Sequence, residues 1–114
     1  KYNGKIVVAS IPYGVYCNDS QVETRKRLGF RLNADSVKND IQDDIIADIC
    51  KRLDIEFITV TKKFRLNARN DHLFFRWDGH FTEQGHRFFA ESLFPRLGLC
   101  KSGALPFFRF SLVR

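Results

Sequence analysis

Two short apolar segments on either side of an amphipathic stretch constrain the fold of this chain more than any other feature. Residues 5–12 (KIVVASIP) form a β-rich apolar run closed by proline, as expected of a strand buried on both faces. Residues 55–60 (IEFITV) form a second run, whose side chains suit a pleated sheet. Because a helix pattern lies between them, we predict a β–α–β unit with parallel strands and a right-handed crossover.

The stretch between these segments predicts a helix of about five turns, which Asp35 or Ser36 can cap. Acidic residues near its start and Lys51–Arg52 at its end suit the direction of the helix dipole. An apolar residue recurs every four positions and three more widen the stripe, which is typical of a helix that packs one face against a core. The stripe comprises Val37, Ile41, Ile45, Ile46, Ile49, Cys50 and Leu53.

A second amphipathic helix is predicted over residues 82–96. Thr82 is a suitable N-cap, Pro95 falls late in the helix and Gly98 supplies a stop. The apolar positions again follow helical spacing and define one face. They are His86, Phe89, Ala90, Leu93, Phe94 and Leu97.

The remaining segments have weaker patterns. A short helix fits residues 21–28, ended by Gly29. Residues 62–77 are predicted to be a long connection, and such loops after strands in α/β proteins commonly carry function. Residues 99–114 alternate loosely and fit a C-terminal tail or an edge strand. We therefore expect one α/β domain portion over residues 1–98, followed by this tail.

The charge of the chain is compatible with an anionic partner but does not demand one. Its formal net charge is +6 over 114 residues. The basic residues fall in separate clusters between acidic and apolar stretches, which favours a solvated surface over a nucleic-acid track. No stretch approaches ~18 uninterrupted apolar residues, so no membrane span is predicted. The basic clusters are Arg25–Lys26–Arg27, Lys51–Arg52, Lys62–Lys63–Arg65 and Arg69.

The three cysteines, at positions 17, 50 and 100, match no metal or redox motif. Their odd number excludes a complete disulfide framework. We expect free thiols, with Cys50 buried on the connecting helix. They leave the cellular compartment open.

The clearest chemical signal is an Asp and a His two residues apart, Asp78 and His80. Gly79 between them allows a tight turn, in which the carboxylate can reach Nδ1 of the ring and leave Nε2 to take a proton. In nucleophilic hydrolases such a carboxylate orients the imidazole and stabilises the imidazolium that forms. The alternative is structural, with Asp78 in an Asx turn and His80 capping the next helix.

The segment from Trp77 to Leu93 resembles the last sequence block of the SGNH (GDSL-type) hydrolases and acyltransferases. In that family an Asp and a His precede a helix whose first turn holds a Gly followed by His or Tyr. The matching residues here are Asp78, His80, Gly85 and His86. Residues 6–16 and 50–60 resemble a strand and a helix-to-strand approach of the same fold, so the resemblance covers most of residues 5–97.

The resemblance implies a parallel, flavodoxin-like sheet flanked by helices, of which this chain is the C-terminal part. It also implies a Ser–His–Asp triad with His80 and Asp78 as two members, and no metal or organic cofactor. A secreted, periplasmic or membrane-associated parent protein fits the family. The expected activity is that of an esterase or O-acyltransferase on the acyl or acetyl groups of a small molecule or a glycan.

Two departures from the family pattern shape this expectation. The spacing here is Asp-x-His, where Asp-x-x-His is commoner; the shorter form occurs in relatives that move acetyl groups on polysaccharides. The family's Gly-Asp-Ser nucleophile segment does not occur, and Ser20, in the nearest look-alike, follows the wrong strand. The implied Ser therefore lies outside this chain, which alone is expected to be inactive.

An incomplete sheet has a further consequence, because it leaves an edge and an apolar face uncovered. We expect the missing N-terminal half, a swapped dimer or another second chain to cover them. Two other functional interpretations stay open. One is a small, complete, basic module without catalysis that binds nucleic acid or anionic glycan. The other is a degenerate SGNH relative that keeps the fold for interaction.

Several neighbours of the Asp–His pair have both a structural and a functional interpretation. Trp77 and the nearby Phe residues either pack in the core or exclude water from the pair. Arg76 can meet an anionic or carbonyl group of a substrate, or simply be exposed. His86 lies on the apolar stripe and is predicted to be buried. A metal site from Asp78, His80 and His86 is disfavoured, because their spacing is not a recognised ligand pattern.

Overall fold

The computed structural model describes residues 4–33, 39–67 and 72–98 of the 114-residue chain. Within them it has a mixed α/β fold. Its elements in chain order are β1 (Val7–Ala9), α1 (Gly14–Cys17), α2 (Asp19–Arg27), α3 (Ile41–Arg52), β2 (Glu56–Ile58), α4 (Thr61–Asn67), α5 (Glu83–Leu93) and the 3-10 helix η2 (Phe94–Leu97).

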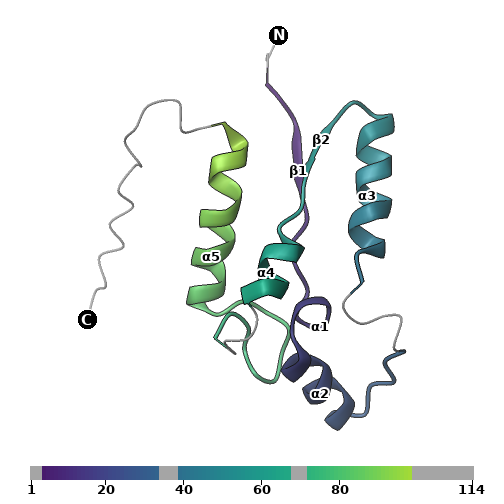
Figure 1. The fold of residues 1–114 in the computed structure, drawn as a ribbon, viewed down its shortest axis with the longest axis vertical. Helices are drawn as coiled ribbons and strands as arrows, with labels where there is room; N and C mark the ends of the chain where they lie inside the picture. Colours follow the sequence, from purple (N-terminus) through teal and green to yellow (C-terminus); the bar gives the residue numbers. More distant parts are fainter. Residues whose placement is uncertain (1–3, 34–38, 68–71, 99–114) are drawn as a thin grey trace, which may run out of the picture.

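A small parallel sheet of β1 and β2 forms the centre of the molecule. Val7 lies opposite Glu56 and Ala9 opposite Ile58, so the predicted β–α–β pairing of parallel strands is confirmed. In Figure 1 the strands run through the middle, with α3 on one side and α5 on the other. Both strands are shorter than the apolar runs that predicted them, since only three residues of each are paired.

The core lies between β2 and the helices α1, α4 and α5. Phe64 of α4 has no exposed surface, and its ring stacks on that of Phe81 with 4.9 Å between the ring centroids. The ring of Phe88 meets Phe64 edge-on, also at 4.9 Å. Aromatic pairs in these arrangements add to the gain from burying apolar area. The buried members of the cluster are Cys17, Ile58, Val60, Phe64, Phe74 and Phe81.

The segment after β2 corrects one prediction. Residues 62–77 are not one long connection, because α4 occupies Thr61–Asn67 directly after the strand. The Phe64 amide donates to the Val60 carbonyl at 3.0 Å, which starts the helix at the end of the strand. Lys, Arg and Leu favour helix, and the turn carries Phe64 into the core. Because Phe64 is the one buried apolar residue of α4, the sequence of this helix shows no amphipathic pattern from which it could be predicted.

The connecting helix also differs from its prediction. Its proposed caps Asp35 and Ser36, and Val37, lie outside the described residues, and the described helix α3 begins at Ile41. Cys50 is buried and is a free thiol, as is the buried Cys17, whereas Cys100 lies outside the described residues. The predicted core stripe is otherwise wrong, because most of it is solvent-exposed: Ile41 by 56%, Ile45 by 56%, Ile49 by 42% and Leu53 by 63%.

The reason for the exposed stripe is the small area of the sheet. A sheet of two short strands covers only a narrow band of a helix. On α3, Cys50 is buried and Ile46 is half-buried, whereas Ile41, Ile45, Ile49 and the C-cap residue Leu53 are solvent-exposed among the described residues. These four residues give α3 an exposed apolar flank.

The last helix follows its prediction at the start and departs from it at the end. Thr82 caps α5, since its hydroxyl accepts from the Gly85 amide at 3.1 Å. Pro95 lacks an amide hydrogen and cannot continue the α-helical ladder, so the α-helix ends at Leu93 and η2 follows. Gly98 then ends η2 with a φ of +65°. The predicted tail at 99–114 lies outside the described residues.

The other predicted helix, over residues 21–28, exists as α2 but begins and ends slightly earlier, at Asp19 and Arg27. Asn18 caps it, because its side-chain oxygen accepts from the Ser20 amide at 2.7 Å. Gly29 follows with a φ of +87°, as the predicted stop requires. The short α1 before it was not predicted.

Gly85 is required by a close approach rather than by its backbone angles. A Cβ at this position would overlap the Leu73 carbonyl oxygen and touch Cβ of Phe81 at 3.0 Å. The obstacle is backbone, which a side-chain rotation cannot remove. The glycine therefore lets the start of α5 lie directly against the preceding loop.

We predict that Gly85→Ala destabilises the protein by about 1–3 kcal/mol through this overlap, although alanine favours helix by about 1 kcal/mol. Urea unfolding measures the effect. Gly4→Ala is the matched control, because nothing lies within 4 Å of a Cβ there, and it should shift stability by less than about 0.5 kcal/mol. A more stable Gly85→Ala protein would contradict the packing argument.

Candidate functional site

The Asp–His pair lies at the tip of a short hairpin loop that precedes α5. Phe74 and Phe81 form an antiparallel bridge, and both are buried in the core. Beyond them the Phe75 amide donates to the His80 carbonyl at 2.9 Å. The two legs are thus anchored by aromatic side chains, and Asp78–Gly79–His80 forms the exposed end of the loop.

The structure brings Asp78 and His80 into direct contact. Oδ1 of Asp78 lies 3.0 Å from Nδ1 of His80 and also accepts from the His80 backbone amide at 2.8 Å. The His80 side chain is 86% exposed and that of Asp78 is 55% exposed. Because the carboxylate engages Nδ1, the opposite nitrogen Nε2 is left accessible at the surface.

Part of the structural alternative also holds. The bond from the His80 amide to the Asp78 side chain is an Asx turn, so the carboxylate shapes the loop as well as meeting the ring. His80 does not cap the following helix, however, since Thr82 does. One oxygen therefore serves both the turn and the imidazole.

Asp78 is held in its ionised form by these same contacts. The hydrogen bond from the His80 backbone amide lowers the pKa of Asp78 below its ordinary value, and the His80 ring and the Arg25 guanidinium act in the same direction. An ionised carboxylate beside Nδ1 favours the tautomer with its proton on that nitrogen. Nε2 is then the basic atom.

The tip of the loop rests on Tyr13, which comes from the segment between β1 and α1. A Cβ at Gly79 would overlap the Tyr13 ring, so the glycine allows this close approach. The Arg25 guanidinium lies 5.6 Å from the centroid of this Tyr13 ring and 5.4 Å from that of the Phe30 ring. Sequence patterns did not indicate this support.

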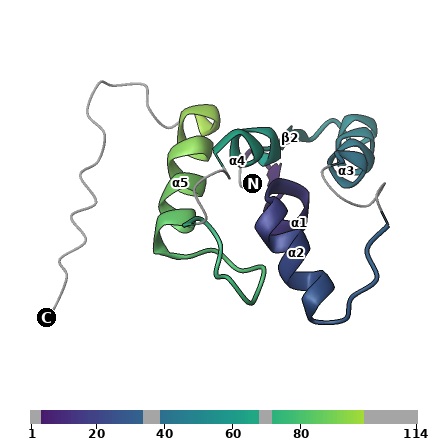
Figure 2. The ribbon, with the colours of Figure 1, turned by 60° about the horizontal axis from the view of Figure 1, so that its bottom comes forward.

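A buried glutamine fixes the other side of the loop. Gln21 of α2 is only 2% exposed, and its Nε2 donates to the Phe75 carbonyl at 2.8 Å. Figures 1 and 2 both show the loop before α5 beside α1 and α2. The position of the Asp–His tip therefore depends on residues more than fifty positions earlier in the chain.

The remaining predicted site residues are arranged less tightly. Trp77 is 57% exposed, and the Arg76 guanidinium lies 5.1 Å from its ring centroid. Phe75 is also exposed, whereas Phe74 and Phe81 belong to the core. Trp77 and Arg76 thus form an exposed cation–π pair next to the tip rather than a closed wall.

The prediction that His86 is buried is wrong. Its side chain is exposed at the start of α5, with its ring edge-on to Phe81 at 5.4 Å between centroids. His86 is the first residue of the predicted apolar face, and it lies in the first turn of α5, next to the exposed loop. Among the described residues, no group of three His, Cys, Asp or Glu side chains is placed to hold a metal ion.

Cys17 and Ser20 are two of the described side chains of nucleophilic type outside the loop. Cys17 is buried, and burial raises its pKa to about 12, so the thiol stays protonated near neutral pH. Ser20 lies in the first turn of α2, where its amide donates to the Asn18 cap.

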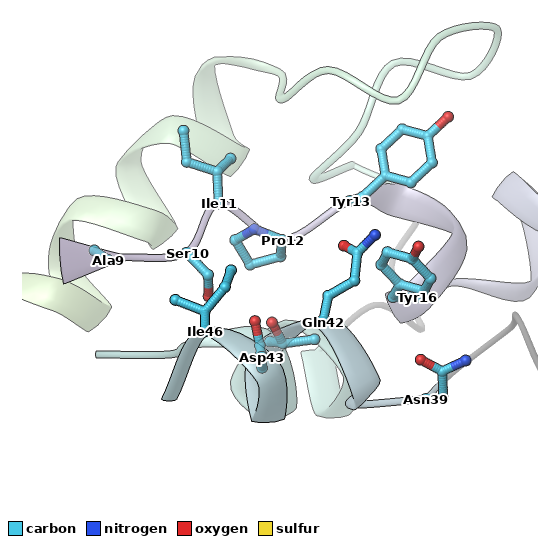
Figure 3. Close-up of a pocket in the computed structure, with 11 residues that line it drawn as sticks. Ala9, Ser10, Ile11, Pro12, Tyr13, Tyr16, Asn39, Gln42, Asp43 and Ile46 are labelled. Carbon is cyan, nitrogen blue, oxygen red and sulfur yellow. The ribbon is translucent and has the colours of Figure 1, made fainter. Parts of the chain in front are cut away.

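A pocket of about 350 Å³ opens beside the site, at the carboxyl end of β1. Figure 3 shows its two walls, the segment Ala9–Tyr13 and the first turns of α3. Open α/β sheets bind ligands at the carboxyl ends of their strands. Tyr13 lines this pocket and also supports Gly79, so the pocket and the Asp–His tip share one residue.

Comparisons with protein-family models, curated proteins and solved structures gave no match to this chain. In the part of the chain that the structure describes, no helix is long and apolar enough to cross a membrane.

We predict that Asp78 titrates below the ordinary range of an aspartate, as measured by the pH dependence of its side-chain carbon shift in NMR. Because the folded state binds this proton more weakly than the unfolded chain, the contribution to stability is present at neutral pH. It is lost as the pH falls through the acidic range below about 4. His80→Ala keeps the backbone amide donor, so the pKa of Asp78 should stay lowered; an ordinary pKa in the wild type would contradict the geometry.

We predict that Gln21→Met destabilises the protein by about 1–2 kcal/mol, because it leaves the Phe75 carbonyl without its donor. Hydrogen exchange of the Phe75 amide should become faster, since the loop loses one of its two supports. Glu23→Gln is the control, as Glu23 is exposed on the same helix and pairs only at the surface with Lys26. Unchanged exchange at Phe75 would show that Gln21 does not hold the loop.

Proposed function

We propose that this chain is the C-terminal part of an SGNH-type esterase or O-acyltransferase. The observation that carries the proposal is the 3.0 Å contact between Asp78 Oδ1 and His80 Nδ1, on an exposed loop beside the carboxyl end of a parallel sheet. This is the arrangement that a general base requires, with one ring nitrogen oriented by a carboxylate and the other accessible. The resemblance of residues 77–93 to the family's last block supports the same assignment.

In the proposed reaction a serine from outside these 114 residues attacks the ester carbonyl. Nε2 of His80 takes the hydroxyl proton as the serine oxygen bonds to the carbonyl carbon. The imidazolium, stabilised by Asp78, then gives this proton to the leaving alcohol as the C–O bond of the ester breaks. Water, or the hydroxyl of an acceptor, releases the acyl group in a second cycle of the same steps.

The proposal extends to the fold. A flavodoxin-like sheet continued by further strands would cover the open sheet edge and the exposed flank of α3, which in this chain consists of Ile41, Ile45, Ile49 and Leu53. The missing half of the domain, a swapped dimer or a second chain would supply that cover. Arg76 and Trp77, next to the tip, would contact the substrate.

We predict that His80→Ala lowers the hydrolysis of p-nitrophenyl acetate by the longest natural protein containing this chain by roughly 10⁴-fold. Asp78→Asn should lower it by about 10²–10⁴-fold, because the amide no longer favours the productive tautomer. The 114 residues alone should be inactive. His86→Ala is the control, since His86 is an exposed histidine six positions later and should leave turnover unchanged.

Normal ester hydrolysis by the His80→Ala protein would reject the proposal. If that protein also binds nucleic acid or anionic glycan with an affinity that falls steeply with salt, the chain is a basic binding module instead.

A further inference from the structure

We propose that the pocket between β1 and α3 binds a neutral, hydroxyl-rich ring, that is, one sugar unit of the substrate. The inference deepens the proposed function, because it assigns a substrate class to a pocket that shares Tyr13 with the candidate catalytic loop. It depends on four features of the pocket: its charge, its hydrogen-bonding groups, its rings and its size.

The charge of the pocket excludes anionic ligands. Asp43 is the charged residue among those that line it, and its carboxylate is held in place by the Thr59 hydroxyl. No basic residue is among the described residues that line it, and the Arg65 guanidinium and the Lys62 ammonium both pair with Asp40. A phosphate or carboxylate would therefore meet the negative charge of Asp43.

The polar groups of the pocket both donate and accept hydrogen bonds. Besides the Asp43 acceptor, the lining residues include the hydroxyl-bearing Ser10, Tyr16 and Thr61 and the amide-bearing Asn39 and Gln42. Sugar hydroxyls likewise act as donor and acceptor at once, so they can satisfy such a set. An alkyl or acyl chain would offer these groups no further hydrogen bond.

Ser10 adds a specific requirement for a polar partner. Its Oγ is buried and has no hydrogen-bond partner among the described residues. In Figure 3 the side chain points towards the α3 wall, near Asp43 and Ile46. A change of the Ser10 rotamer would bring the hydroxyl to a ligand in the pocket, which supplies the missing bond.

The apolar part of the lining suits a ring. The Tyr16 ring, Pro12 and Ile46 supply apolar surface to the lining, whereas the Tyr13 ring points away from the α3 wall. The C–H faces of a pyranose pack on such surfaces while its hydroxyls meet the polar groups. A volume of about 350 Å³ is near the lower limit for ligand sites, so it holds one ring rather than a long chain.

The position of the pocket relates it to the chemistry. Tyr13 forms part of its wall and its ring also contacts Gly79, between the two members of the Asp–His pair. A sugar held on one side of Tyr13 therefore lies beside the loop that carries His80. The bound ring would be the unit whose hydroxyl carries or accepts the acyl group.

The test is a titration of the full 114-residue chain with D-glucose and with N-acetyl-D-glucosamine, followed by amide shifts in NMR. We expect saturable shifts at Ser10 and Asp43 with about millimolar affinity, as is usual for so small a ligand. Asp43→Asn keeps an oxygen for the Thr59 hydroxyl but removes the charge, and Ser10→Ala removes the buried hydroxyl. Each should weaken binding several-fold or more.

The matched control is Asp48→Asn, a carboxylate on the same helix that pairs with Arg52 and does not line the pocket. It should leave sugar affinity unchanged. Absence of saturation with both sugars, or affinity unaffected by Asp43→Asn and Ser10→Ala, would overturn the inference. Tighter binding of tetramethylammonium than of either sugar would overturn it too, since Tyr16 and Asp43 would then form a site for an organic cation.

The same variants separate this inference from the proposed function. His80→Ala should keep sugar binding while it abolishes ester hydrolysis in the longer protein. Sugar binding with hydrolysis that is indifferent to His80 rejects the proposed function alone. Hydrolysis that depends on His80, with no sugar bound, rejects the sugar pocket alone.

Discussion

The stacking of Phe64 on Phe81 is the contact on which the rest of the structure depends. Phe64 is fully buried on the helix that follows β2, and Phe81 closes the hairpin loop that carries Asp78 and His80. The stack therefore joins the segment after β2 to the loop that carries the Asp–His pair. A loop anchored at both legs by buried rings can present polar residues at its tip without the disorder expected of a long connection.

The α/β class and the parallel strands were predictable, because two largely apolar segments flank a helix with clear periodicity. Two features of the fold were not predictable from the sequence. The helix after β2 buries Phe64 and little else, so its sequence has no amphipathic pattern. The face of α3 that packs inward was misjudged, because four-residue spacing marks an apolar flank, and the extent of the sheet decides whether that flank is covered. Ile45 and Cys50 both lie on α3, yet Ile45 is exposed and Cys50 is buried.

The contact between Asp78 and His80 followed from local reasoning, since a glycine between two polar residues permits a tight turn. The residues that position this turn could not be predicted in the same way. Gln21 and Tyr13 lie far away in sequence, and a single buried glutamine or a single tyrosine is part of no recognisable pattern. The exposure of His86 was likewise missed, because helical periodicity does not show where a helix emerges from the surface.

One consequence concerns motion. A single oxygen of Asp78 accepts from the His80 backbone amide and also contacts the His80 ring, so a change in the peptide geometry of this turn moves the carboxylate that orients the imidazole. A molecule that presses on the hairpin tip and twists this peptide would also break the contact with Nδ1. The orientation of the imidazole is in this way coupled to the shape of the loop.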